Sequence, residues 1–249
     1  MKKFLFVCGV PRSGTTALSR LIGKHPQIVM GTERYKFLYS QPDAVNADLF
    51  TKDRFFSFSE QDTNLLPNTE GRKAYYDSLL KKFDKAIYVG DKTPGIFNRY
   101  QTIFERFDQA KVLFIVRDIH QVASSWNVRA LNSDQSRWKR DMDYKQAVTT
   151  WNDSLKKTID AIDQGKDILV VNYNKFFDSE QNDPLNNLQK LLDYLRIDND
   201  TKFEKGYLEI CTKFTELKDK ELTIFEGQQN YINQEANFEL YNQILELSI

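Results

Sequence analysis

Short apolar runs that alternate with helical patterns constrain the fold of this chain more than any other feature. The runs lie at 3–8, 86–95, 112–116 and 168–173, and each is bounded by glycine, proline or charged residues. Such runs are typical of buried strands. Helical patterns follow from about residue 14 and over 70–84, 96–107, 119–126, 142–164 and 185–195. The alternation predicts an α/β fold of three layers, in which helices flank a central, mostly parallel sheet.

The rest of the chain is less regular. The stretch 40–68 is rich in Phe, Asp and Ser, and we interpret it as a loop or an insertion with short helices. Residues 200–249 are polar and helical or irregular. With 249 residues and no low-complexity linker, the chain is expected to be a single domain over 1–249.

Composition excludes several classes of protein. Thirty-five basic residues balance thirty-five acidic ones, whereas a dedicated nucleic-acid binder is expected to be basic. Two cysteines do not make a disulfide scaffold, and the two histidines show no metal-ligand spacing, so no metal is expected. The apolar start is short and is interrupted by PRSG, and no run approaches a membrane span. We therefore expect a cytoplasmic protein with no membrane partner, whose oligomeric state the sequence leaves open.

The segment GVPRSGTT, residues 9–16, has the outline of a phosphate-binding loop. A nucleotide triphosphatase loop would place Lys where Thr15 stands, and here the cation, Arg12, lies inside the loop. A helix N-terminus after a strand exposes unpaired amides and attracts anions. Gly14 permits a close backbone approach, and the hydroxyls of Thr15 and Thr16 add donors. The alternative is a tight turn with a solvated arginine.

Three polar segments follow the predicted strands at their carboxyl ends. They are PRSGTT after 3–8, DKTP after the run that begins at 86, and RD with SS seven residues later after 112–116. In parallel α/β sheets, ligands bind outside the carboxyl ends of the strands. Their order along the chain therefore predicts one shared binding site.

The segments resemble the sulfotransferases that use 3′-phosphoadenosine 5′-phosphosulfate. GVPRSGTT followed by HP and GTER is similar to that family's 5′-phosphosulfate loop, and VLFIVRDIHQVASSW carries an Arg with a Ser eight residues on, like its second motif. DKTP resembles a segment near the acceptor in carbohydrate-type members, and VVNYNKF resembles a strand end whose Tyr approaches the nucleotide. The resemblance covers residues 4–195. Arg12 and Ala17, where small-phenol members have Lys and Trp, are more similar to the protein-tyrosine and carbohydrate branches.

The resemblance implies a role for each site residue. Donor-binding residues would be Pro11, Arg12, Ser13, Gly14, Thr15 and Thr16 around the 5′-phosphate, Arg117 and Ser125 at the 3′-phosphate, and Tyr173 near the nucleotide. Arg12 would also stabilise charge on the bridging oxygen, and Lys92 would contact the sulfuryl group or the acceptor, unless it is simply exposed. The family's basic, glycine-rich C-terminal loop is not evident, and Lys218 or Lys220 would have to substitute for it.

Transfer to a hydroxyl needs a base within hydrogen-bond reach. By resemblance this is Glu33, at an expected strand-to-helix junction, although a helix-start glutamate would look the same. The other candidates are His25, His120 and Asp91. His25 also fits a helix-end residue, and His120 a solvated position on a helix.

The sequence thus predicts a sulfotransferase whose acceptor is a small molecule, a carbohydrate or a peptide. A sulfuryl donor carries less charge at the reacting group than a triphosphate, so a cation inside the loop fits where a kinase needs Mg²⁺. One rival is a Mg²⁺-dependent nucleotide or small-molecule kinase with an altered loop, which would use Asp91 or Asp118 at a strand end. The other is a non-catalytic nucleotide-binding module with 40–68 as a partner surface.

Overall fold

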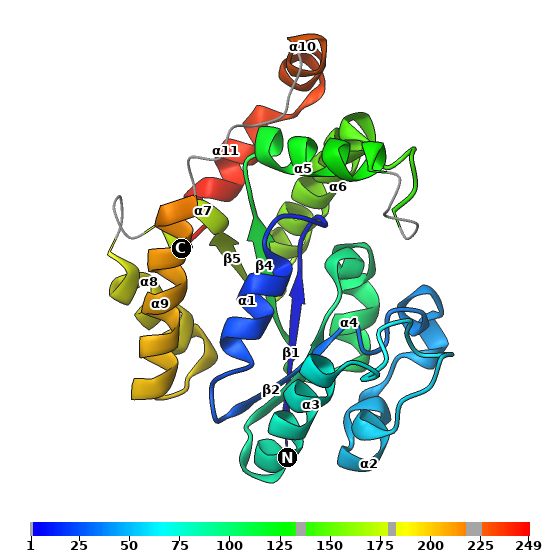
Figure 1. Cartoon of the computed structure of the whole chain (residues 1–249), viewed down its shortest axis with the longest axis vertical. Helices are drawn as coiled ribbons and strands as arrows, with labels where there is room; N and C mark the ends of the chain where they lie inside the picture. Colours follow the sequence, from blue (N-terminus) through cyan, green and yellow to red (C-terminus); the bar gives the residue numbers. More distant parts are fainter. Residues whose placement is uncertain (1, 133–137, 179–182, 218–225) are drawn as a thin grey trace.

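In a computed structural model, five parallel strands form a single sheet in the order β2-β3-β1-β4-β5 (Figure 1). Residues 2–132, 138–178, 183–217 and 226–249 are described. The strands are β1 (Lys3–Cys8), β2 (Ile28–Thr32), β3 (Tyr88–Lys92), β4 (Lys111–Val116) and β5 (Ile168–Asn172). Four of them coincide with the predicted runs; β2 fills the short stretch between the first helix and Glu33.

Helices occupy nearly all the predicted positions. They are α1 (Thr15–Ile22), α2 (Lys52–Phe56), α3 (Glu70–Lys82), α4 (Tyr100–Arg106), α5 (Ile119–Leu131), α6 (Tyr144–Asp163), α7 (Tyr173–Phe177), α8 (Pro184–Leu195), α9 (Thr201–Leu217), α10 (Glu226–Glu235) and α11 (Phe238–Glu246). Short 3₁₀ turns, η1 (Leu38–Ser40), η2 (Pro42–Ala44) and η3 (Ala47–Phe50), precede α2, so 40–68 does carry short helices. The helix expected over 96–107 divides into η5 (Pro94–Arg99) and α4, because the backbone of Arg99 (φ −133°, ψ 18°) departs from helical geometry between them.

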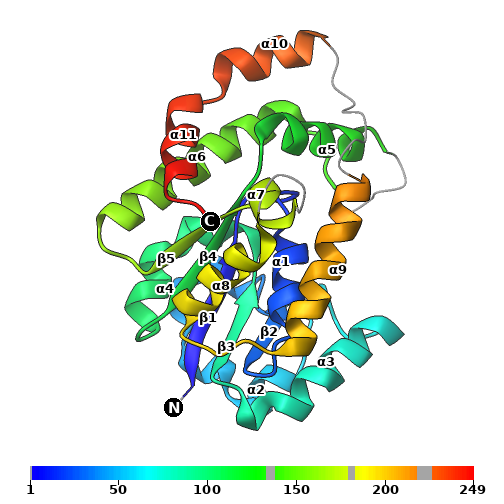
Figure 2. The ribbon, with the colours of Figure 1, turned by 90° about the vertical axis from the view of Figure 1, so that its left-hand side faces the viewer.

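Two apolar clusters, one on each face of the sheet, confirm the three-layer α/β fold. On one face Leu18 and Leu21 of α1 pack with the leucines of α8 and with Phe203 and Tyr207 of α9. On the other face Trp151, Leu155 and Ile159 of α6 pack with Ile103 of α4, the 40–58 segment and Ile244 of α11. Figure 1 shows α8 and α9 on one side of the strands and α4 and α6 on the other, and in Figure 2 α8 lies in front of the strands.

The amphipathic pattern expected over 142–164 becomes α6, the longest described helix. Asp143 caps it by accepting hydrogen bonds from the amides of Lys145 and Gln146, at 2.9 and 3.2 Å. A carboxylate at this position also interacts favourably with the helix dipole. The cap fixes where α6 begins, and α6 in turn covers the sheet beside the site.

The last residues of the chain return to the sheet. The Ile249 amide donates to the Val170 carbonyl at 3.1 Å, and the Asn172 amide donates to the Ile249 carbonyl at 3.0 Å. The C-terminus therefore continues the sheet next to β5, a pairing that the polar pattern of 200–249 does not announce.

Candidate active site

The loop between β1 and α1 has the backbone of an anion cradle. Gly14 is the N-cap of α1 with φ 96°, and no side chain caps this helix. The first amides of a helix have no carbonyl of their own helix to pair with. Arg12 also has a positive φ, 79°, which is uncommon for a non-glycine residue and marks a constrained loop. Ser13 and Thr15 are buried within the loop, whereas Thr16 is exposed.

Arg12 and Ser125 meet across this loop, as two predicted donor-binding residues should. The Arg12 Nε donates to the Ser125 hydroxyl at 2.9 Å. Arg117, at the end of β4, donates from Nε to the Gln121 side chain at 2.7 Å, and its Nη1 lies 3.4 Å from the Arg12 carbonyl oxygen. One loop, one strand end and one helix thus bring these side chains together.

The guanidinium groups of this cluster repel one another. Burial, followed by the charges of Arg129 and Arg117, lowers the pKa of Arg12, and burial lowers the pKa of Arg117. Arginine stays protonated despite such shifts. A concentration of like charge that is partly removed from water is favourable only when an anion binds there.

Tyr173, at the start of α7, forms the floor between the loop and Arg117. The Arg117 guanidinium stacks over its ring at 4.4 Å from the centroid. A Cβ on residue 14 would lie 2.2 Å from the Tyr173 Cδ2, so only glycine fits against this ring. The phenol therefore borders both predicted phosphate positions.

Trp126 and Trp151 lie on the apolar faces of predicted helices, where the sequence predicts core residues, and they also fix the backbone of the site. The Trp126 indole N–H donates to the Pro11 carbonyl at 2.7 Å, and that of Trp151 donates to the Arg117 carbonyl at 3.0 Å. Both side chains are at most 2% exposed. Their helix-face spacing predicts burial, but periodicity does not reveal the hydrogen bonds.

Glu33 and Lys92 form an ion pair at the carboxyl ends of β2 and β3. The Lys92 Nζ lies 3.0 Å from the Glu33 Oε1, and the Lys36 Nζ lies 3.3 Å from Oε2. Lys92 is 2% exposed, so the alternative of a simply exposed lysine is wrong. Burial raises the pKa of Glu33, but Lys92 and Lys36 outweigh it and lower the pKa overall. Glu33 is therefore ionised at neutral pH.

The backbone at Glu33 differs from the expected strand-to-helix junction. β2 ends at Thr32, Glu33 has φ 50°, and a non-helical turn follows until η1 begins at Leu38. A residue inside a right-handed helix has a negative φ, and the next helical element begins only five residues after Glu33. The interpretation as a helix-start glutamate is therefore wrong.

The other candidate bases are occupied elsewhere. His25 is 1% exposed; its Nδ1 accepts from the Gln27 amide at 3.2 Å, so Nε2 is the donor to the Asp198 carbonyl at 3.0 Å. His120 lies on α5 and is partly exposed, and its Nε2 pairs with the Asn233 side chain at 2.9 Å. Asp91 is fully buried, and its oxygens accept backbone amides.

The sheet orders these residues in a single row. From β2 to β5, the strand ends present Glu33, Lys92, the Arg12 loop, Arg117 and Tyr173. The register supports this: Val7 and Thr32 both lie opposite Lys92 in neighbouring strands. Lys218 and Lys220, suggested as substitutes for a C-terminal basic loop, lie outside the described residues.

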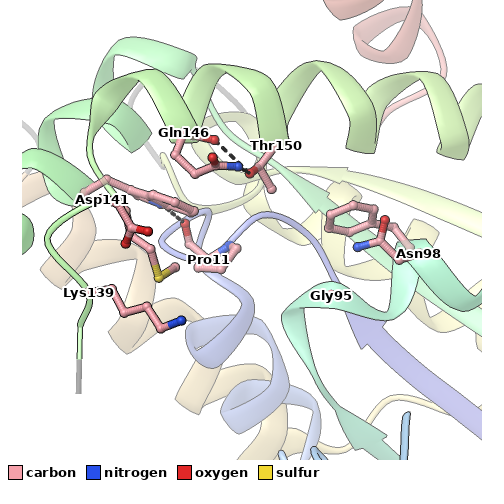
Figure 3. A pocket seen from close by; sticks show the side chains of 10 residues that line it. Pro11, Gly95, Asn98, Lys139, Asp141, Gln146 and Thr150 are labelled. Carbon is pink, nitrogen blue, oxygen red and sulfur yellow. Dashed lines mark hydrogen bonds between the residues drawn. The ribbon is translucent and has the colours of Figure 1, made fainter. Parts of the chain in front are cut away.

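A pocket of about 370 Å³ opens beside the loop (Figure 3). In Figure 3, Gln146 and Thr150 of α6 lie over Pro11, with Gly95 and Asn98 at one end and Lys139 and Asp141 at the other. Phe97, Trp126 and Met142 complete the lining. The pocket borders the Arg12 loop through Pro11 and the segment that follows β3 through Gly95.

Comparison with known proteins agrees with this geometry. The model of the sulfotransferase family matches residues 5–201, and the chain therefore belongs to the sulfotransferase family. The resemblance seen in the sequence motifs is thereby confirmed.

Individual relatives fit the same picture. The chain is similar to protein-tyrosine sulfotransferase A of Caenorhabditis elegans, with 26% identity over 63% of this chain and 40% of the relative. The Drosophila melanogaster protein-tyrosine sulfotransferase gives 26% identity over 68% of this chain and 34% of the relative. The matches span less than half the length of both relatives. A solved structure, the sulfotransferase domain from the curacin biosynthetic pathway, has a TM-score of 0.55 at 15% identity over 94% of this chain and 97% of that domain, which shows a shared fold.

None of the described helices has both the length and the apolar character needed to cross a lipid bilayer.

Proposed function

We propose that this chain is an enzyme that transfers a sulfuryl group from 3′-phosphoadenosine 5′-phosphosulfate to a hydroxyl, or an amine, of an acceptor. The observation that carries the proposal is the row of strand ends, which separates a cationic cluster around Arg12 and Arg117 from the Glu33–Lys92 ion pair. A donor with two anionic ends and a reactive group fits such a row.

The donor would lie along the strand ends. The amides of residues 12–16, with Ser13, Thr15 and Thr16, would hold the 5′-phosphate over the N-terminus of α1, while Arg117 and Ser125 would hold the 3′-phosphate. Neighbouring strands lie about 4.8 Å apart, so β3 and β4, two steps apart, are separated by about 10 Å. That spacing suits a donor whose sulfuryl group is near Lys92 and whose 3′-phosphate is near Arg117.

In the proposed reaction, Glu33 at one end of the row accepts a proton, and Arg12 farther along the row stabilises the leaving group. The acceptor oxygen attacks sulfur while the Glu33 carboxylate accepts its proton, and the bond between sulfur and the bridging oxygen breaks. The electron pair of that bond remains on the 5′-phosphate of the leaving adenosine 3′,5′-bisphosphate. The Arg12 Nε is hydrogen-bonded to Ser125, and the terminal nitrogens of Arg12 would face the negative charge that grows on the bridging oxygen. Lys92 would contact the sulfuryl oxygens.

The pocket in Figure 3 is our candidate for the acceptor site. It borders Pro11 on one side and the segment after Lys92 on the other, and its amide and hydroxyl side chains can bind a polar acceptor. A small molecule, a carbohydrate and the side chain of a peptide all remain within the proposal. A location in the cytoplasm, away from nucleic acid and membranes, belongs to the same proposal.

The kinase rival needs a free carboxylate at a strand end. Both oxygens of Asp91 accept backbone amides inside the protein, and Asp118 caps α5 by accepting from the Gln121 amide at 3.2 Å. The non-catalytic rival leaves unexplained why Lys92, which is buried, is paired with Glu33 at the strand ends. Both arguments favour transfer over the rivals.

Donor binding and transfer test the proposal together. Adenosine 3′,5′-bisphosphate should bind in the presence of a metal chelator and should bind more tightly than ATP with Mg²⁺. A screen of acceptors with sulfur-labelled donor should then find a labelled product. Strict dependence on Mg²⁺, or a preference for ATP, would refute the proposed donor.

A further inference from the structure

The residue proposed as the base lies in a strained turn. Glu33 has φ 50°, in the left-handed region that non-glycine residues rarely adopt. Such a conformation persists only where surrounding contacts fix it. The structure should therefore contain a group that holds this turn.

Asp91 is that group. The Arg34 amide donates to its Oδ1 at 2.9 Å, and the Tyr35 amide donates to its Oδ2 at 3.2 Å. The Glu33 amide donates to the carbonyl of the adjacent Lys92 at 2.7 Å. Three consecutive amides of the turn thus bond to two consecutive residues of β3.

The fold leaves space for the Asp91 carboxylate, although its burial is unfavourable. Asp91 is 0% exposed, and a buried carboxylate is unfavourable unless hydrogen bonds satisfy it. In the pairing of β2 with β3 it lies opposite Gly31, where a Cβ would come within 2.8 Å of its Oδ1. A glycine in this strand therefore leaves the space that the Asp91 carboxylate fills.

A second anchor follows directly after Glu33. The Arg34 side chain is fully buried and donates to the Phe55 carbonyl at 2.9 Å and to the Asp62 carboxylate at 2.8 Å. Arg34 is thus tied to the 54–62 segment by its side chain and to Asp91 by its amide. Glu33 has little freedom to move unless one of these anchors is lost.

We propose that Asp91 is a positioning residue, which holds the Glu33–Tyr35 turn so that the Glu33 carboxylate faces Lys92 at the strand ends. Its oxygens are turned to backbone amides, so it acts through Glu33 and does not touch the substrate. Only the expected effect on turnover rests on the proposed function. The hydrogen bonds that link Asp91 to the turn do not depend on it.

The variant Asp91→Asn tests this with little change in volume. Its amide oxygen can still accept one backbone N–H, but its NH₂ group opposes the other. Displacement of the Glu33 carboxylate should lower kcat by about tenfold to a hundredfold, since small errors in position are costly to catalysis. The affinity for adenosine 3′,5′-bisphosphate should stay unchanged, because Asp91 does not contact the donor loop.

Two further measurements separate positioning from general damage. In a Glu33→Gln background, Asp91→Asn should lower kcat by less than about twofold, because residues that act as a unit are not additive. In hydrogen exchange, the Arg34 and Tyr35 amides should lose protection in Asp91→Asn.

Asp183→Asn is the matched control, since Asp183 also accepts two backbone amides, from Leu185 at 3.0 Å and Asn186 at 3.2 Å, at the start of α8. It should change neither kcat nor the exchange of Arg34 and Tyr35.

Wild-type turnover in Asp91→Asn, or an equal loss of kcat with and without Glu33, would overturn the proposal. If the wild-type chain transferred sulfuryl to no acceptor, the proposed function would fail by itself. Exchange would then decide on Asp91: unchanged protection of the Arg34 and Tyr35 amides would refute its positioning role, and a loss specific to Asp91→Asn would support it.

Discussion

At the scale of single residues, the site is a set of charged groups whose pKa values are shifted by burial and by neighbouring charges. Burial and like charges lower the pKa of Arg12, and burial lowers that of Arg117. Glu33 is held ionised by Lys92 and Lys36. A bound donor would relieve the repulsion among the arginines, so ligand affinity and unliganded stability should oppose each other at these positions.

Arg117→Ala should weaken binding of adenosine 3′,5′-bisphosphate much more than binding of adenosine 5′-phosphate, which lacks the 3′-phosphate. A charge-assisted hydrogen bond contributes about 1.5–3 kcal/mol, and calorimetry on both ligands measures the difference. Arg106→Ala is the control, because Arg106 is exposed and pairs with Asp43 at 3.1 Å, away from the site. Equal losses for the two ligands would mean that Arg117 acts on the fold and not on the 3′-phosphate.

Arg12→Ala and Glu33→Gln should affect different steps. Arg12→Ala should lower kcat with a modest effect on donor affinity, because the charge it stabilises grows as the S–O bond breaks. Glu33→Gln cannot accept a proton, and a positioned base contributes about 10²–10⁴-fold, so kcat should fall by that order with normal bisphosphate binding.

Steady-state kinetics with acceptors of different acidity measures the effect of Glu33→Gln. The loss should shrink for an acidic acceptor, whose hydroxyl needs less help to ionise. Near wild-type turnover in Glu33→Gln would leave the reaction without an assigned base.

At the scale of elements, helices α5 and α6 do more than cover the sheet. Each carries a buried tryptophan whose indole N–H donates to a carbonyl of the candidate donor site, that of Pro11 or Arg117. The bond from Trp126 fixes the loop just before Arg12, which lies in the left-handed region. The apolar faces of these helices therefore set loop geometry as well as stability.

Trp126→Phe should loosen the loop, because the buried Pro11 carbonyl loses its donor. An unsatisfied buried group costs about 1–3 kcal/mol of unfolding free energy, and donor affinity should fall as well. Denaturant unfolding and bisphosphate titration measure the two effects. Trp138→Phe removes a similar bond, to the Met142 carbonyl at 2.8 Å, but should leave donor affinity unchanged. An identical loss of affinity in both variants would argue against a specific role for the Trp126 bond.

At the scale of the whole molecule, the buried carboxylate of Asp91 links stability to pH. Burial raises its pKa to about 6, against the backbone amides of Arg34 and Tyr35 and the charge of Lys92, which lower it; the Glu33 charge raises it. Between about pH 4 and 6 the folded chain then holds a proton that the unfolded chain has released. Its contribution to the unfolding free energy therefore falls as pH rises through this window.

Comparison of the wild type with Asp91→Asn isolates this titration, because groups common to both largely cancel. The wild type should lose about 2 kcal/mol of stability relative to Asp91→Asn between pH 4 and 6, because the slope is at most about 1.4 kcal/mol for each pH unit and is smaller near either pKa. Urea unfolding at several pH values measures the difference. Stability that rose relative to the variant over this range would show that hydrogen bonds outweigh burial at Asp91.

Local pattern was sufficient for most of the elements and for the convergence of the candidate residues at one edge of the sheet. The apolar runs predict four of the five strands, and the loop with Arg12, Gly14 and the Arg117–Ser125 spacing predicts which strand ends matter. These signals predict local structure because the spacing of apolar residues and the residue types at turns and helix starts depend only on neighbours in the sequence. The roles assigned to the individual residues stay predictions.

Only the tertiary structure decided what each side chain meets. The sequence predicts Glu33 at a strand-to-helix junction, but pairing of β2 with β3 puts it in a strained turn between Lys92 and the amides that bond to Asp91. It predicts Trp126 and Trp151 as core residues. Packing of α5 and α6 also brings their indole N–H groups into hydrogen bonds with backbone carbonyls of the candidate site. Such partners are 34–115 residues apart in the chain, and no local period encodes contacts between residues so distant in sequence.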